Sequence, residues 1–207
     1  MRTALALVVL AAAAEAQNRR SVDWPSYGND AGGLKYSPLT DVNRANVARL
    51  EVAFTWNTNE SNIPASEGQR AARPGQFQAT PIAINDTLFF PTPFNRVIAL
   101  DANTGREYWS YDPQPWKTYG QPSNGTGFVH RGVATWTDGR ERRVFINSRW
   151  RLIALDASTG KPIASFGNNG EVDLTAGLSR PVRKEHLHEY VTARRVGESR
   201  HPRQRRR

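Results

Sequence analysis

The chain has 207 residues, no cysteine and a formal net charge of +9. Without cysteine no disulfide can hold the fold together, so its stability must come from packing. The positive charge invites a nucleic-acid-binding function, but residues 190–207 hold seven arginines and one acid, Glu198, and so supply six of the nine net charges. The remainder is nearly balanced, and we expect no nucleic-acid partner.

The first residues are typical of an exported protein. One arginine is followed by an apolar run over residues 4–14, and Ala14-Glu15-Ala16 has the small-x-small pattern of a cleavage site. We therefore predict a signal peptide over residues 1–16 and a periplasmic location. The alternative is an uncleaved segment that associates the protein with the membrane, although the run is short for a membrane span.

Short apolar segments predict the first group of strands. Residues 79–83, 87–90 and 97–100 are candidate strands, and Asp101-Ala-Asn-Thr-Gly105 follows the third. The aspartate can accept hydrogen bonds from backbone N–H groups just ahead of it, and the glycine can adopt a positive φ, so this stretch predicts a tight turn. Residues 106–111 alternate polar and aromatic side chains, as a returning strand does.

The same unit occurs again further along the chain. Residues 133–136 and 143–146 are candidate strands around the turn Thr137-Asp138-Gly139, and RLIALDASTG from Arg151 nearly repeats RVIALDANTG from Arg96. Four strands in about 50 residues, repeated, predict the blades of a β-propeller. A β-sandwich with two similar hairpins is the alternative. The second copy has Ala164 where the first has Trp109, and Phe166 is a candidate to replace part of that side chain.

Several ordered motifs resemble the pyrroloquinoline quinone (PQQ)-dependent dehydrogenases, the quinoprotein glucose and alcohol dehydrogenases, with the closer likeness to the glucose branch. The resemblance covers residues 22–188. The motifs are WPSYGNDAGGLKYSPLTDVNRANVARLEVAFTW (24–56), FQATPIAINDTLFFPTPFNRVIALDANTG (77–105), HRGVATWTDG (130–139) and FGNNGEVDLTAGL (166–178).

The resemblance implies an all-β fold, an eight-bladed propeller of which residues 17–189 form about the first two blades. It also implies PQQ and Ca²⁺ as cofactors, an alcohol or aldose sugar as substrate and a quinone or cytochrome as electron acceptor. Where the family continues with Thr-Ser-Pro-Pro and a strand, this chain has an arginine-rich tail at residues 190–207. A shifted reading frame can restore the family pattern, so we expect a disordered, out-of-frame tail.

Arg131 is the first candidate for binding PQQ, which carries three carboxylates. A guanidinium matches a carboxylate in fork geometry, and the family's arginine in this Arg-Gly motif pairs with one of them. Gln78 stands where the family places a Glu or Gln that bonds PQQ, and Asn147 stands where relatives have a threonine. The alternatives are an ion pair for Arg131 at a blade junction and backbone partners for Gln78.

The remaining candidates are weaker. His130 could offer a flat ring to PQQ, but a lone histidine is more often a structural hydrogen-bonding group. The tryptophans are expected to pack between blades. His186 and His188 are not expected to bind metal. By the resemblance, the general-base aspartate and the Ca²⁺ ligands lie beyond this chain, so we expect no catalytic residue in it and no activity alone. A non-enzymatic assembly propeller and a non-folding gene remnant are the rival interpretations.

Overall fold

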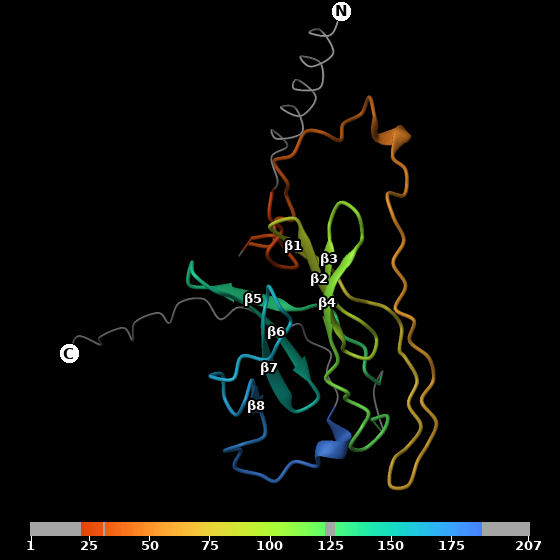
Figure 1. The fold of residues 1–207 in the computed structure, drawn as a ribbon, viewed down its shortest axis with the longest axis vertical. Helices are drawn as coiled ribbons and strands as arrows, with labels where there is room; N and C mark the ends of the chain where they lie inside the picture. Colours follow the sequence, from red (N-terminus) through yellow and green to blue (C-terminus); the bar gives the residue numbers. More distant parts are fainter. Residues whose placement is uncertain (1–21, 31, 123–126, 188–207) are drawn as a thin grey trace, which may run out of the picture.

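The structure is a computed structural model that describes residues 22–30, 32–122 and 127–187. It is built from two four-stranded antiparallel sheets, formed by consecutive parts of the chain (Figure 1). The first contains β1 (Ile82–Ile84), β2 (Thr87–Pro91), β3 (Val97–Asp101) and β4 (Glu107–Tyr111). The second contains β5 (Ala134–Thr137), β6 (Arg142–Ser148), β7 (Arg151–Asp156) and β8 (Glu171–Asp173). Each sheet is hydrogen-bonded in chain order, which confirms the predicted all-β blades.

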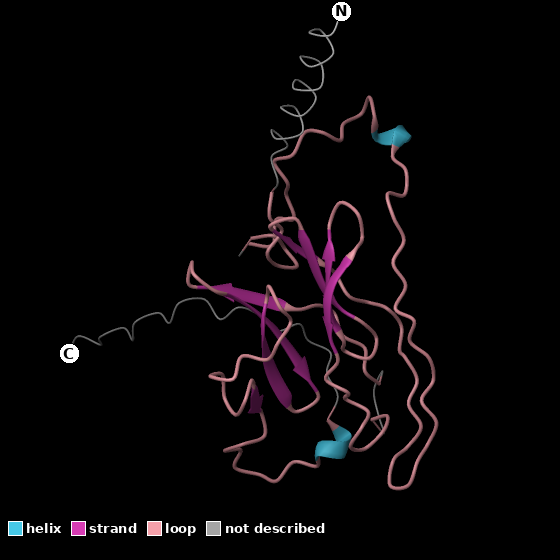
Figure 2. Cartoon of the chain, viewed as in Figure 1, coloured by secondary structure: helices cyan, strands magenta, loops and turns pink. Residues whose placement is uncertain are grey.

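Two single-turn 3₁₀ helices, η1 (Val47–Arg49) and η2 (Lys184–His186), are the helical elements of the described residues (Figure 2). The predicted signal peptide at residues 1–16 and the tail at 190–207 lie outside these residues. No helix in the described part is long and apolar enough to cross a membrane.

The tight turns follow the residues that predicted them. Asp101 Oδ1 accepts hydrogen bonds from the N–H groups of Asn103 and Thr104, both at 2.9 Å, and Gly105 has φ 72°. The β5–β6 turn is closed in the same way, because Asp138 Oδ1 accepts from Arg140 N and Glu141 N at 2.9 Å. Short-range side-chain hydrogen bonds therefore stabilise these turns without any tertiary contact.

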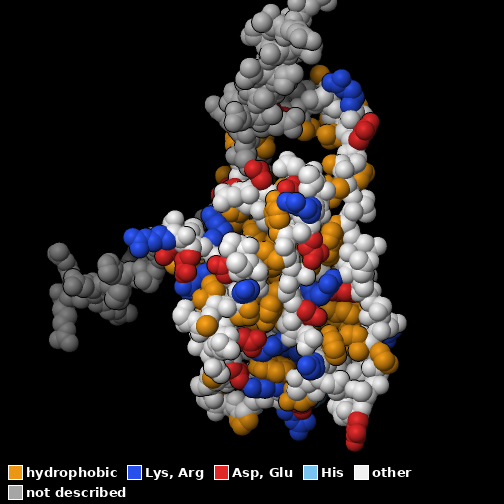
Figure 3. All heavy atoms as spheres, viewed as in Figure 1, with side chains coloured by type: hydrophobic (Ala, Val, Ile, Leu, Met, Phe, Trp, Pro, Cys, Tyr) orange, Lys and Arg blue, Asp and Glu red, His pale blue; other side chains and the backbone are white. Residues whose placement is uncertain are grey.

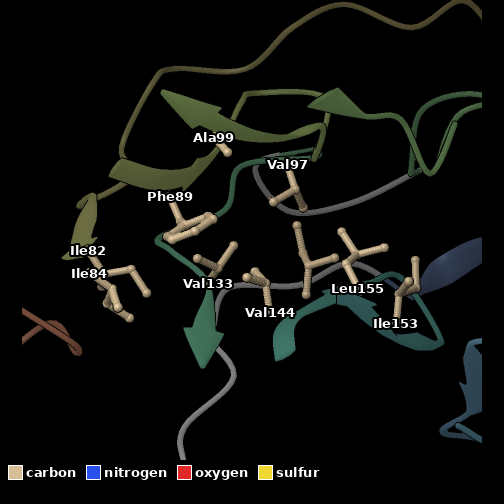
Figure 4. Close-up of a cluster of buried hydrophobic side chains, with 10 residues drawn as sticks. Ile82, Ile84, Phe89, Val97, Ala99, Val133, Val144, Ile153 and Leu155 are labelled. Carbon is tan, nitrogen blue, oxygen red and sulfur yellow. The ribbon is translucent and has the colours of Figure 1, made fainter. Parts of the chain in front are cut away.

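The main core lies between the two sheets. Side chains from β1, β2 and β3 point toward the side chain of Val133, just before β5, and toward side chains from β6 and β7 (Figure 4). The cluster comprises Ile82, Ile84, Phe89, Val97, Ala99, Val133, Val144, Ile146, Ile153 and Leu155. A buried Val, Leu, Ile or Phe side chain contributes about 1.5–3 kcal/mol relative to an exposed one, so this cluster is the main term that holds the sheets face to face.

The first sheet is covered on its other face as well. Phe90, Ile98 and Leu100 pack there against Phe54 and Trp56, which come from the long irregular segment that precedes the sheet. Trp56 meets Phe90 edge-on, with 5.4 Å between ring centroids. Burial on both faces explains why Val97–Leu100 is a continuous apolar run rather than an alternating one.

A buried carboxylate fastens that long segment to the sheet. The side chain of Glu60 is 6% exposed and accepts hydrogen bonds from Arg96 Nε at 3.1 Å, Phe94 N at 3.2 Å and the Thr92 hydroxyl. These donors all belong to the β2–β3 connection. Because every bond is charge-assisted, the ion is well compensated for its removal from water.

The exact start of β1 differs from the prediction. We predicted a strand from residue 79, but β1 begins at Ile82. Pro81 has no N–H to donate to a ladder, and the N–H of Thr80 is directed at the second sheet's entry segment instead of at β2.

Candidate functional site

The entry segments of the two sheets are hydrogen-bonded to each other. β1 and β5 are the first strands of their sheets, and Thr80 N, just before β1, donates to Arg131 O, just before β5, at 2.9 Å. This bond brings the stretch that contains Gln78 beside the stretch that contains Arg131. Two predicted cofactor-binding residues, 53 positions apart in the sequence, therefore lie on neighbouring backbone segments.

Arg131 has an exposed side chain on a firmly held backbone. Its carbonyl accepts from Thr80 N, and the flanking residues His130 and Gly132 are both buried. The guanidinium lies on the side of the N-terminal loop: the hydrogen bond from Lys35 Nζ to the Tyr27 hydroxyl, 3.1 Å, lowers the pKa of Tyr27, and the charge of Arg131 adds a smaller effect in the same direction. Two cations thus act on one exposed phenol.

The side chain of Gln78 is exposed and hydrogen-bonded to that of another glutamine, Gln76. Its Nε2 donates to Gln76 Oε1 at 3.1 Å. The partner of the Gln78 amide among the described residues is thus a side chain. Gln76 was not singled out from the sequence, and no spacing signal distinguishes it.

Asn147 lies near the end of β6 and is half-buried. Its side-chain Oδ1 and its backbone oxygen both lie 3.1 Å from Nε2 of His130. The other ring nitrogen of His130, Nδ1, accepts from Gly132 N at 3.3 Å. The predicted structural role of His130 as a hydrogen-bonding group is therefore what the geometry supports.

His130 is 2% exposed. Burial lowers the pKa of its imidazole, because removal from water disfavours the charged ring, and the bonds to Asn147 oppose this effect. The ring is therefore neutral near pH 7.

The candidate residues carry hydrogen-bond donors rather than metal ligands. Within the described residues, no group of three or more His, Cys, Asp or Glu side chains is placed to hold a metal ion. Arg131 carries five N–H donors, and the amides of Gln78 and Asn147 carry two each. Such a set suits a ligand rich in carboxylate and carbonyl oxygens.

Two surface hollows lie outside this group. One of about 490 Å³ is lined by Phe54, Trp56, Phe77, Phe90 and their neighbours, and one of about 300 Å³ lies beside Arg149 and Trp150. Neither is lined by Arg131, Gln78 or Asn147. Figure 3 shows that exposed hydrophobic side chains also accompany the long N-terminal segment, among them Leu34, Tyr36, Leu50 and Val52.

Comparison with known proteins agrees with this architecture. Residues 24–196 match the family described as "PQQ: Glucose/ethanol/alcohol dehydrogenase, beta-propeller domain". The chain is 34% identical to quinoprotein glucose dehydrogenase A of Acinetobacter calcoaceticus over 73% of its own length and 20% of the relative's. It is 32% identical to the quinoprotein glucose dehydrogenase of Escherichia coli over 81% of its length and 21% of the relative's.

A solved structure shows the same arrangement of strands. The crystal structure of quinohemoprotein alcohol dehydrogenase from Comamonas testosteroni matches 79% of this chain and 21% of its own, with a TM-score of 0.56 and 29% identity. The chain thus spans about one fifth of the length of the relatives it matches. The predicted propeller origin of its two sheets is confirmed, and the chain belongs to the family of PQQ-dependent quinoprotein dehydrogenases.

Proposed function

We propose that this chain forms the first two blades of a periplasmic PQQ-dependent dehydrogenase that oxidises an alcohol or aldose sugar, and that it supplies part of the PQQ site. The observation that carries the proposal is the bond from Thr80 N to Arg131 O. It joins the entries of two successive blades, so that residues from both can reach one ligand.

The residues present fit the cofactor. Arg131 would pair with a PQQ carboxylate, because its fork of N–H groups matches two carboxylate oxygens. Gln78 would add an uncharged amide donor, and Asn147 another from the β6 end. When bound, PQQ supplies the electron acceptor for the hydride of the substrate carbon. These three residues bind and orient the cofactor, and none of them is a base for the substrate hydroxyl.

The further parts of the proposal follow the family. Ca²⁺, a quinone or cytochrome acceptor and the general base would be provided outside the residues described here. Export through residues 1–16 would place the protein in the periplasm, and an uncleaved segment would attach it to the membrane.

The test is a PQQ titration of the 207-residue protein, followed by tryptophan fluorescence. We expect Arg131→Ala to weaken PQQ binding about tenfold, the effect of losing one charge-assisted hydrogen-bonded contact. Arg131→Lys should recover part of the affinity, since it keeps the charge and loses the fork. Arg140→Ala is the matched control, because Arg140 is an exposed arginine in the β5–β6 turn. No PQQ binding up to millimolar concentration, or equal weakening by both alanine variants, would overturn the proposal.

A second measurement separates binding from catalysis. With PQQ, Ca²⁺ and a sugar or alcohol added, we expect the purified chain to reduce no electron-accepting dye, because Arg131, Gln78 and Asn147 include no base for the substrate hydroxyl. Dye reduction that depends on PQQ would contradict this expectation.

A further inference from the structure

Two backbone groups define the state of the His130 ring. The N–H of Gly132 can only donate, so Nδ1 of His130, 3.3 Å away, accepts. The carbonyl oxygen of Asn147 can only accept, so Nε2, 3.1 Å away, carries a hydrogen and donates. Because neither partner can exchange its role, the ring is the neutral tautomer with its hydrogen on Nε2.

The tautomer of His130 determines the orientation of the side-chain amide of Asn147. The same Nε2 hydrogen lies 3.1 Å from the side-chain amide of Asn147, and a donor needs the amide oxygen there. The oxygen therefore faces His130, and the NH₂ group is turned away from it. The backbone of Asn147 is held independently, because it pairs with Leu152 in the β6–β7 ladder. The amide oxygen is thus engaged by His130, and the two N–H groups lie on the side of the amide that is turned away from the ring.

The hydrogen bond between Gly132 N and the His130 ring also constrains Arg131, the residue between them. The bond from Gly132 N to the His130 ring spans the peptide units on either side of Arg131. The carbonyl of Arg131 is fixed from the other sheet by Thr80 N at 2.9 Å. These two hydrogen bonds fix the backbone on both sides of Arg131. They therefore set the direction of its Cα–Cβ bond.

We propose that His130 is a positioning residue that orients Arg131 and the Asn147 amide together, so that both present hydrogen-bond donors to one oxygen-rich ligand. On the function proposed above, which this inference rests on, the ligand oxygens are those of PQQ. A ligand that offered donors at the same place would meet only the N–H groups of Asn147 and Arg131 and would be rejected.

Nuclear magnetic resonance tests the geometry without any cofactor. In the ¹⁵N-labelled 207-residue protein at neutral pH, long-range ¹⁵N–¹H correlations of the imidazoles should show His130 with its hydrogen on Nε2. The chain has four histidines, and the signal of His130 is the one that disappears in His130→Gln. A ring with its hydrogen on Nδ1, or a charged ring, would overturn the proposal.

Two substitutions separate positioning from simple support of the fold. His130→Gln keeps an N–H donor near the position of Nε2, whereas His130→Asn is too short to reach Asn147. Because His130→Gln keeps the donor to Asn147 but loses the Nδ1 acceptor of Gly132 N, we expect PQQ affinity about threefold weaker than the wild type for the first and about tenfold weaker for the second. The side-chain NH₂ resonances of Asn147 should keep their positions in His130→Gln and move in His130→Asn.

Ser148→Ala is the control from the next residue. Its hydroxyl donates to Asn95 Oδ1 at 3.2 Å and makes no bond to the His130 ring, so this variant should lose stability while the Asn147 amide keeps its hydrogen bond to His130 and its resonances move less than in His130→Asn. Equal effects of His130→Asn and Ser148→Ala on those resonances would show that His130 acts only through the fold. If the wild type binds no PQQ, the proposed function fails, while the tautomer and the Asn147 resonances still decide the role of His130. If His130→Asn does not fold, the wild-type tautomer and His130→Gln decide it.

Discussion

The two hairpins that share a sequence share a turn but not a return strand. In both, the aspartate side chain accepts two N–H bonds of 2.9 Å, from Asn103 and Thr104 in the first hairpin and from Ser158 and Thr159 in the second. The glycines that follow have nearly the same φ, 72° and 69°. The local motif therefore fixes the turn wherever it occurs.

After the turn, the hairpins diverge. In the first, β4 begins at Glu107 and pairs without a break except for a bulge near Ala99. In the second, Ile163 N donates to Ala154 O at 2.9 Å, and the next partner of Ala154 is Gly170, whose carbonyl accepts from Ala154 N at 3.0 Å. Residues 164–169 therefore leave the ladder as a loop. The return strand is set by the residues after the turn, not by the turn.

The divergence matters for packing between the sheets. Trp109 on β4 packs against the second sheet, where its Nε1 donates to Ala157 O at 3.0 Å. A Cβ added at Gly160 would lie 2.5 Å from the Trp109 ring. Gly105 is approached in the same way by Phe54, from the segment before the first sheet. In each hairpin, the glycine of the turn therefore packs against an aromatic ring from an earlier part of the chain.

The largest expected effect is that of Trp109→Ala. This substitution removes a ring that contacts Phe89 and Gly160 and leaves the carbonyl of Ala157 without its donor. We expect a loss of about 3 kcal/mol in the free energy of unfolding, measured by urea denaturation. Trp136→Ala is the control, since Trp136 is 37% exposed and should cost less than about 1 kcal/mol. Equal losses would mean that Trp109 does not join the sheets.

Gly160→Ala should cost somewhat less, about 2–3 kcal/mol. The positive φ accounts for about 1 kcal/mol, and displacement of the Trp109 ring by the new methyl group accounts for the rest. Gly139→Ala separates the two causes, because Gly139 has φ 92° and an added Cβ meets nothing within 4 Å. If both variants lose the same stability in urea, the contact between Gly160 and Trp109 is not tight.

The contrast between the shared turns and the different return strands also explains which features could be predicted from the sequence. Turns, strands and the buried run at Val97–Leu100 depend on residues close in the chain, and these predictions are confirmed. The late start of β1 was not predicted, because Thr80 N donates to Arg131 O before the second sheet, a partner that only the assembled fold provides. The loop at 164–169 was not predicted, because the motif that precedes it is nearly the same in both hairpins.

In the candidate site, too, the contacts between distant segments could not be predicted from the sequence. Arg131, Gln78 and Asn147 were identified through resemblance to a family, and their role with PQQ stays a prediction. What the sequence could not give is the contact between Thr80 and Arg131 or the orientation of Asn147 by His130. Thr80 and Arg131 precede strands of different sheets, and His130 lies before β5 while Asn147 lies in β6, so neither contact follows from periodicity or from a short-range motif.

The smallest expected effect distinguishes the two turn aspartates by their hydroxyl partners. The hydrogen bond from the Tyr108 hydroxyl, 2.7 Å, together with backbone N–H bonds, lowers the pKa of Asp101 to about 2. The pKa of Asp156 is also lowered, first by the Ser158 hydroxyl. Tyr108→Phe should therefore raise the pKa of Asp101 toward its usual value and leave Asp156 unchanged, whereas Ser158→Ala should do the reverse.

Carboxyl ¹³C chemical shifts followed from pH 6 to pH 1.5 measure both groups. Since the folded pKa of Asp101 lies below the value of about 4 in an unfolded chain, its stabilising contribution is present above pH 4 and is lost as the pH falls toward 2. In Tyr108→Phe this acid-sensitive contribution should shrink, because the folded and unfolded values approach each other. An Asp101 that still titrates near 2 without the Tyr108 hydroxyl would show that the backbone N–H groups alone hold the charge, and that the two turns are electrostatically the same.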